Sequence, residues 1–149
     1  MRPDLEQFLI KAGKAKPGDV IGLSDSEISS IERTMSLELP EIYKNFLRIC
    51  GRKAGELFED VDSFYPVILE LREELEEILE EIGSSFTLPD DAFVFSGYQG
   101  YQYLYFICGE PDPKVWILND GGGPPKIHSK SLSEHFARAV QPGREKLYQ

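Results

Sequence analysis

The side chains of this chain that most readily bind a metal are two histidines and two cysteines. His128 and His135 are seven residues apart, and Cys50 and Cys108 are distant from them and from each other. Zinc sites use closer pairs, such as Cys-x2-Cys or His-x3-His. We therefore expect no metal site, with each histidine at a strand end or on a helix surface. Both cysteines lie in apolar segments, which predicts buried thiols rather than a disulfide.

Three further patterns could serve catalysis, and none has the context that its chemistry needs. Gly121 to Lys126 is rich in glycine, but a phosphate loop requires Lys-Ser/Thr leading into a helix, and two prolines here lack an N–H. Asp90 and Asp91 are adjacent in a polar turn, where two carboxylates rarely differ in pKa. No Gly-x-Ser-x-Gly or His-Glu-x-x-His sequence occurs. We expect a protein without catalytic residues, metal or cofactor, and an enzyme with an unrecognised site is the less favoured alternative.

The net charge of −10 is concentrated in one segment. Between Pro66 and Ile82 there are seven Glu and one Arg, so this segment contributes −6. An acidic chain lacks the basic surface that binding to nucleic acid or anionic lipid requires. We therefore expect neither as a partner, whereas a basic protein surface is compatible with this charge.

The periodicity of the acidic segment predicts the longest helix of the chain, ending at Gly83. Its apolar side carries Ile68, Leu71, Leu75, Ile78 and Ile82. At 3.6 residues per turn, the opposite side carries Glu70, Glu73, Glu77 and Glu80. A solvated face is the simpler interpretation of such a charge run. The alternative is that this acidic stripe binds a basic protein surface.

Four other helices are predicted from apolar spacing and capping residues. A short one covers Asp4 to Ala12, and a second begins at Ser24, which has capping-box spacing with Glu27. Its apolar positions are Ile28, Ile31 and Met35.

The third helix opens at Leu39-Pro40, with the proline at its first position. It carries Ile42, Tyr43, Phe46, Leu47 and Cys50 on one face, followed by Gly51 as a left-handed C-cap. The final helix follows Ser131 and Glu134, a second capping box.

Three strands are predicted between the acidic helix and the final helix. They cover Phe93 to Phe95, Tyr101 to Cys108, and Val115 to Leu118, the last being apolar on both faces and therefore central. Short turns join them, which implies antiparallel pairing. A short strand is also expected near Leu57-Phe58. The result is an α+β fold, a mainly antiparallel sheet packed against N-terminal, central and C-terminal helices. We expect one domain over residues 1–149, with a core of about 24–140 and a polar tail after Pro142.

Tyrosines gather around the turn from Gly97 to Gly100. Alternation along the strand places Tyr101, Tyr103 and Tyr105 on one face, and we expect the last two to be covered. Tyr98 and Tyr101 flank the turn, where exposed aromatic rings are typical anchors of protein interfaces. The predicted partner-binding residues are therefore Glu70, Glu73, Glu77, Glu80, Tyr98 and Tyr101.

The segment from Leu39 to Gly51, LPEIYKNFLRICG, resembles the SUKH superfamily. That superfamily has a Leu-Pro-x-x-Tyr-x-x-Phe-Leu helix after a helix with an x-Ile-x-x-Ile-Glu pattern, here Glu27 to Glu32. Asp112 to Trp116 is similar to its Asp-Pro-x-Val-aromatic strand start. Ser131 to Phe136 is similar to its final helix, with Leu132 in place of a phenylalanine. The resemblance spans Ser24 to Val140, and it implies an α+β fold with a mixed, mainly antiparallel sheet and no catalytic residues.

The resemblance also implies a function. Bacterial members of the superfamily are commonly immunity proteins that bind and neutralise toxins, often nucleases, and fungal members act in cell-wall regulation and signalling. We therefore expect a protein-binding module, an immunity protein whose partner is a toxin domain with a basic surface. The alternative is a scaffold or regulatory module without a toxin partner.

The expected compartment is the cytoplasm. Asp4 and Glu6 interrupt the first apolar residues, unlike a secretory signal, and no apolar run approaches the length of a membrane span. We expect no membrane partner, and the sequence indicates no oligomeric state.

Overall fold

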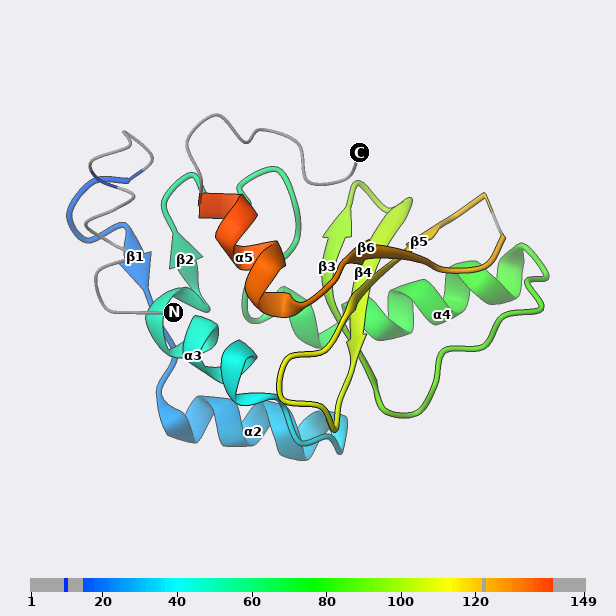
Figure 1. Cartoon of the computed structure of the whole chain (residues 1–149), viewed down its shortest axis with the longest axis horizontal. Coiled ribbons are helices and arrows are strands. Elements are labelled where there is room, and N and C mark those ends of the chain that lie inside the picture. The colour runs from blue at the N-terminus through cyan, green and yellow to red at the C-terminus, as the bar shows by residue number, and fades with distance from the viewer. Residues whose placement is uncertain (1–9, 11–14, 122, 141–149) are drawn as a thin grey trace.

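The chain forms two sheets with helices on either side (Figure 1). The computed structural model describes residues 10, 15–121 and 123–140, so the helix expected at Asp4 to Ala12 lies almost wholly outside these ranges, as does the tail after Pro142. A small antiparallel pair is formed by β1 (Val20–Ile21) and β2 (Lys53–Ala54). The helices α2 (Asp25–Met35) and α3 (Glu41–Cys50) lie between these strands in the sequence.

The second half of the described chain builds the main sheet. A 3-10 turn, η1 (Val67–Leu69), leads into α4 (Leu71–Glu81). Four strands follow, β3 (Ala92–Tyr98), β4 (Gln102–Ile107), β5 (Val115–Asn119) and β6 (Lys126–Ser129), and then α5 (Leu132–Val140). The sheet order is β3-β4-β5-β6, and each neighbouring pair is antiparallel. The predicted α+β fold with an antiparallel sheet is thereby confirmed, and the central position predicted for Val115 to Leu118 is also correct.

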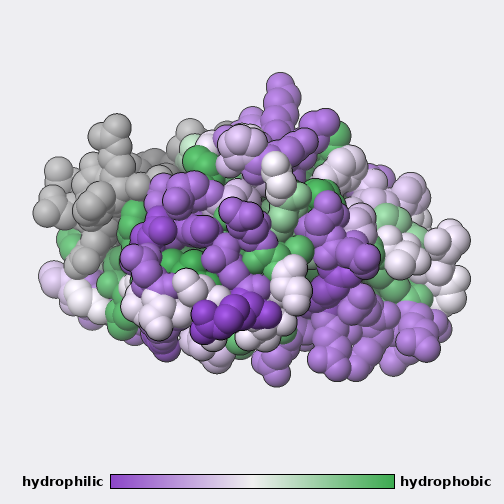
Figure 2. Space-filling model, turned by 90° about the horizontal axis from the view of Figure 1, so that it is seen from below, coloured by the Kyte–Doolittle hydropathy of each residue, from purple (hydrophilic) through white to green (hydrophobic). Residues whose placement is uncertain are grey.

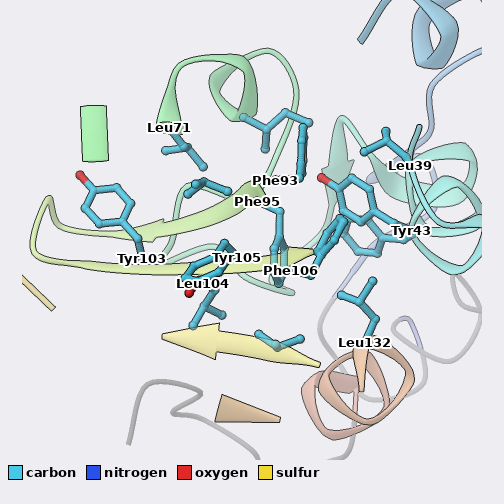
Figure 3. Close-up of a cluster of buried hydrophobic side chains, with 14 of the residues drawn as sticks. Leu39, Tyr43, Leu71, Phe93, Phe95, Tyr103, Leu104, Tyr105, Phe106 and Leu132 are labelled. Atoms are coloured by element: carbon cyan, nitrogen blue, oxygen red, sulfur yellow. The ribbon is translucent and has the colours of Figure 1, made fainter. Parts of the chain in front are cut away.

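One side of the sheet is covered by α3 and α5 through aromatic packing. The ring of Tyr43 lies 5.4 Å from that of Phe93 and 5.2 Å from that of Phe106. Phe46 stacks on Phe136 of α5 at 4.5 Å. Figure 3 shows Tyr43 of α3 and Leu132 of α5 converging on Phe106. All of these side chains are at most 4% exposed, so this cluster is the centre of the core.

The helix α4 packs on the sheet near the β3–β4 turn. A Cβ placed on Gly97 would lie 3.2 Å from Leu71 of α4 and 3.1 Å from the ring of Tyr103. This close approach requires a residue without a side chain at position 97. Figure 3 shows Leu71 and Tyr103 on the side of the sheet away from Leu132.

Local capping signals in the sequence correspond well to the helix boundaries. Ser24 forms the predicted capping box, since its hydroxyl accepts the N–H of Glu27 and the Glu27 carboxylate accepts the N–H of Ser24. Ser131 caps α5 by accepting the N–H of Glu134 at 3.1 Å. The Glu134 carboxylate, however, accepts the N–H of Lys130, so this second box is shifted by one residue.

The predicted left-handed cap at Gly51 is wrong. Gly51 does end α3, but its φ is −61°, and a Cβ there would lie 2.7 Å from the Leu47 carbonyl oxygen. Space, rather than backbone conformation, therefore requires the glycine. Pro40 precedes α3 as its N-cap residue instead of being its first helical residue.

The acidic segment is not one continuous helix. It is broken at Glu70, where η1 ends and α4 begins, and Gly83 follows α4 with a φ of +65°. The break changes which residues face the core. The buried residues are Ile68, Leu71, Leu75 and Leu79. Ile78 is only partly buried and Ile82 is 43% exposed, so their predicted place on the buried side is wrong.

Two strand predictions also need correction. Leu57 and Phe58 are not a strand, because the nearby strand is β2 and Phe58 has a φ of 57° that a strand does not allow. The edge strand β6 was not expected, since Ile127 is its only apolar residue and a Gly/Pro loop precedes it. Every pairing in the described part is antiparallel, so the mixed sheet implied by the resemblance is not seen there.

Candidate protein-binding surface

The outward face of α4 presents its carboxylates to solvent. The four glutamates predicted to form the stripe, Glu70, Glu73, Glu77 and Glu80, are all exposed. Hydrophilic side chains dominate the lower right of Figure 2, below the position of α4 in Figure 1. The sequence analysis therefore identified the exposed face of this helix correctly, although it misjudged part of the buried face.

The single arginine of this segment does not neutralise the stripe. Arg72 points toward the sheet, where its guanidinium donates to the carbonyl oxygens of Pro89 and Ala92 at 3.0 and 2.7 Å. Its Nε lies 3.4 Å from Glu76, the i,i+4 partner. Within the described residues this is the only ion pair made by α4, so its remaining glutamates have no cation of this chain beside them.

The second predicted group, Tyr98 and Tyr101, lies on a tight β3–β4 turn. Gln99 and Gly100 both have positive φ, 50° and 77°, as a type I′ turn requires. The two tyrosine rings are 5.4 Å apart and nearly perpendicular, and Tyr101 is 39% exposed. Tyr103 and Tyr105 are 0% and 3% exposed, which confirms that they are covered.

A buried hydroxyl connects the two groups. Tyr103 donates its O–H to Oε1 of Glu74 on α4 at 2.5 Å. Because Tyr103 is two residues from Tyr101 on the same strand face, the turn lies beside the first half of α4. Glu80 is six residues beyond Glu74, about 9 Å further along the helix axis. The structure thus brings the tyrosine pair close to the start of the stripe but not to its end.

Two aspartates join the same end of the molecule, and the sequence analysis missed both. Asp62 pairs with Gly97 of β3 through two backbone hydrogen bonds, of 2.7 and 3.0 Å. Asp120, just after β5, donates its N–H to the Tyr101 carbonyl oxygen at 2.9 Å. Burial raises the pKa of Tyr103 well above its usual value, and the carboxylates of Glu74, Asp62 and Asp120 raise it further. Three carboxylates from three segments therefore act on one hydroxyl.

The histidines and cysteines behave as core residues. The expectation that His135 lies on a helix surface is wrong, because it is 1% exposed and its ring lies 5.5 Å from those of Phe58 and Phe95. Burial lowers the pKa of His135 to about 3, and the neighbouring His128 and Arg138 lower it too. Alternation of apolar residues along α5 gives no sign of this, since the covering ring comes from the distant Phe58.

The cysteine thiols are poor nucleophiles in this environment. Cys50 is buried and Cys108 is partly buried, and both are free. Burial raises the pKa of Cys50 to about 12 and that of Cys108 to about 11, so both stay protonated. Among the described residues, no group of three or more His, Cys, Asp or Glu side chains is arranged to hold a metal ion. No helix in the same ranges is long and apolar enough to cross a membrane.

The fold and this surface define a small α+β domain that presents an acidic and aromatic face beside a closed aromatic core. The model of the SMI1/KNR4 family (SUKH-1) matches residues 22–138, and the chain belongs to this family. The predicted SUKH membership is thereby confirmed. No curated protein sequence matches the chain. The family-like residues Tyr43, Phe46 and Leu47 are at most 1% exposed, so that motif stabilises the core rather than forming a surface.

Proposed function

We propose that this protein is a non-catalytic protein-binding module, an immunity protein that binds and neutralises a bacterial toxin in the cytoplasm. The observation that carries the proposal is the exposed outer face of α4, whose glutamates lack cations of this chain apart from Arg72. Family membership supplies the class of function, and the surface supplies the place where a partner binds.

The stripe is costly for the helix that carries it. Glu70/Glu74, Glu73/Glu77, Glu76/Glu80 and Glu77/Glu81 are like-charge pairs four residues apart. Each pair destabilises an isolated helix by about 0.2–0.5 kcal/mol. A basic partner offsets this repulsion when it binds. A toxin that acts on nucleic acid has such a surface, because it must neutralise phosphates. Acidic complementarity would steer association with that surface and block it from substrate.

Protection of cells tests this proposal. The toxin encoded beside this gene is expressed with the parent protein or with the variant Glu73→Lys/Glu77→Lys/Glu80→Lys. We expect the parent to copurify with the toxin and restore growth, and the variant to lose both effects. The matched control is Glu56→Lys/Glu59→Lys/Glu110→Lys, which makes the same change in net charge at exposed positions outside α4 and should still protect.

Two outcomes would contradict the proposal. If the control loses protection as fully as the α4 variant, net charge matters and the stripe does not. If the parent neither binds nor protects, the toxin-neutralising function is wrong, and the scaffold or regulatory alternative takes its place.

A further inference from the structure

We propose that an arginine side chain of the protein partner anchors the complex at the end of this surface, beside the β3–β4 turn. The site consists of the rings of Tyr98 and Tyr101 and the carboxylates of Asp62, Glu74 and Asp120, and we call it the tyrosine–carboxylate site. The inference rests on the proposed function for the kind of partner, but the chemical preference of the site is testable by itself.

Backbone contacts hold the parts of the site together. Asp62 is paired with Gly97 at the edge of β3, and Asp120 is bonded to Tyr101 at the start of β4. Glu74 is fixed by the hydroxyl of Tyr103, a fully buried residue, at 2.5 Å. Four segments of the chain therefore position these side chains before any partner arrives, which lowers the entropic cost of binding.

The charges at this site differ from those elsewhere on the protein. Arg48 reaches Asp25 and Glu41 at 2.9 and 3.1 Å, and Lys44 reaches Glu32 at 3.3 Å, so the α2–α3 region supplies its own cations. In the described part of the chain, no Lys or Arg nitrogen lies within 4.0 Å of the carboxylates of Asp62, Glu74 or Asp120. The Tyr103 hydroxyl has one proton, and it is directed to Glu74. The negative potential here is therefore left for an external cation.

The tyrosine rings select among cations. Partial burial, Tyr98 and the Asp120 carboxylate raise the pKa of Tyr101, so its ring stays neutral beside an acid. A guanidinium group is planar and weakly hydrated, so it can stack on an aromatic ring while its N–H groups donate to carboxylates. A lysine ammonium is more strongly hydrated and does not stack in this way. The combination of rings and carboxylates therefore favours arginine over lysine.

The experiment is a titration of the isotope-labelled full chain with acetylated, amidated Gly-Gly-Arg-Gly-Gly, followed by NMR. The same peptide with lysine or with uncharged citrulline replaces it in parallel titrations. We expect the arginine peptide to shift the amide signals of Asp62, Asp120 and the β3–β4 turn. It should bind about fivefold more tightly than the lysine peptide, and the citrulline peptide should bind least.

Variants localise the effect. Tyr101→Ala and Asp120→Asn should each weaken binding of the arginine peptide by about fivefold. The control Glu81→Gln removes one charge at the other end of α4 and should leave binding unchanged. Thermal unfolding of each variant checks that Tyr101→Ala, at an exposed position, is still folded.

The outcomes separate this inference from the proposed function. Equal binding of the arginine and lysine peptides, or shifts spread evenly along α4, would show only general attraction to acid and would overturn the arginine anchor. The anchor is also overturned if the toxin binds Tyr101→Ala as tightly as the parent, although toxin binding itself then stands. Failure of the parent to bind the toxin would refute the proposed function, and the peptide preference would still decide the chemistry of the site.

Discussion

The helices on the two sides of the sheet use the same periodicity for different purposes. α3 buries Tyr43, Phe46, Leu47 and Cys50 in an aromatic core, and its outward Arg48 is paired with acids of α2 and α3. α4 buries only aliphatic residues and directs unpaired glutamates outward. The α3 side satisfies its packing and its charges within the chain. The α4 side satisfies its packing but leaves its charges for another molecule, and this difference indicates where a partner binds.

The largest effect is expected on the α3 side. Phe46 is 1% exposed and stacks on Phe136 at 4.5 Å, so Phe46→Ala leaves a cavity where α3 meets α5. We expect a loss of about 3–5 kcal/mol in the free energy of unfolding, measured by urea denaturation. A variant as stable as the parent that had lost partner binding would reverse the comparison, because α3 would then be the interface.

The next effect is a dependence of stability on pH, also on the α3 side. The pKa of His135 is lowered to about 3, so the buried ring is neutral in the folded protein, whereas the unfolded chain protonates it near pH 6.5. The groups of the neighbouring elements that face it, His128 and Arg138, offer a proton no stabilisation. The stability contributed by the neutral ring is therefore present above pH 6.5 and is lost as the pH falls toward 3.

Between pH 7 and pH 5, this single group should lower the free energy of unfolding by about 2 kcal/mol. Urea denaturation at the two pH values measures this difference. His135→Phe keeps a ring in the aromatic environment but cannot be protonated, and it should lose most of the dependence. If the variant and the parent lose the same stability, another group is responsible.

A smaller effect concerns the hydroxyl at the centre of the core. Tyr43 is 0% exposed, and its O–H has no hydrogen-bond partner among the described residues. Tyr43→Phe removes a buried polar atom without changing the ring, so stability should stay equal or rise by about 1 kcal/mol. Thermal denaturation measures the difference. A decrease of similar size would show that the hydroxyl forms a hydrogen bond that stabilises the core.

The smallest effect is expected on the α4 side. In Glu73→Lys/Glu77→Lys/Glu80→Lys, several repulsive pairs become attractive, so the free protein should be as stable as the parent or up to about 0.5 kcal/mol more stable. Arg48→Glu on α3 is the opposite case. It places a third acid beside Asp25 and Glu41 and should cost up to about 1 kcal/mol. If both variants lost stability equally, the charges of the two helices would not differ in role.

The sequence predicts those features of this molecule that depend on neighbours along the chain. The capping box of Ser24, the apolar face of α3 and the strand β4 arise from local spacing, and all were identified correctly. The outward face of α4 was also found, because exposure of a charged stripe follows from periodicity alone.

Features that depend on distant contacts were not predicted. The burial of His135 requires Phe58 from another segment, and the break before α4 arises where η1 packs on β3. The contact between Tyr103 and Glu74 joins residues 29 apart, and the positions of Asp62 and Asp120 depend on strand pairing. No spacing rule in a single sequence specifies such contacts, so the tyrosine–carboxylate site became visible only in the structure.

The central claim is that α4 serves association and not stability, and the most direct test is the association rate constant with the toxin at low and high salt. For the parent, electrostatic steering predicts a rate that falls by about tenfold or more between roughly 20 and 500 mM salt. For Glu73→Lys/Glu77→Lys/Glu80→Lys, we predict slower association that becomes faster as salt rises, with unchanged unfolding. If the triple variant associates at the parent rate at both salt concentrations, the stripe is only a solvated face and the account is wrong.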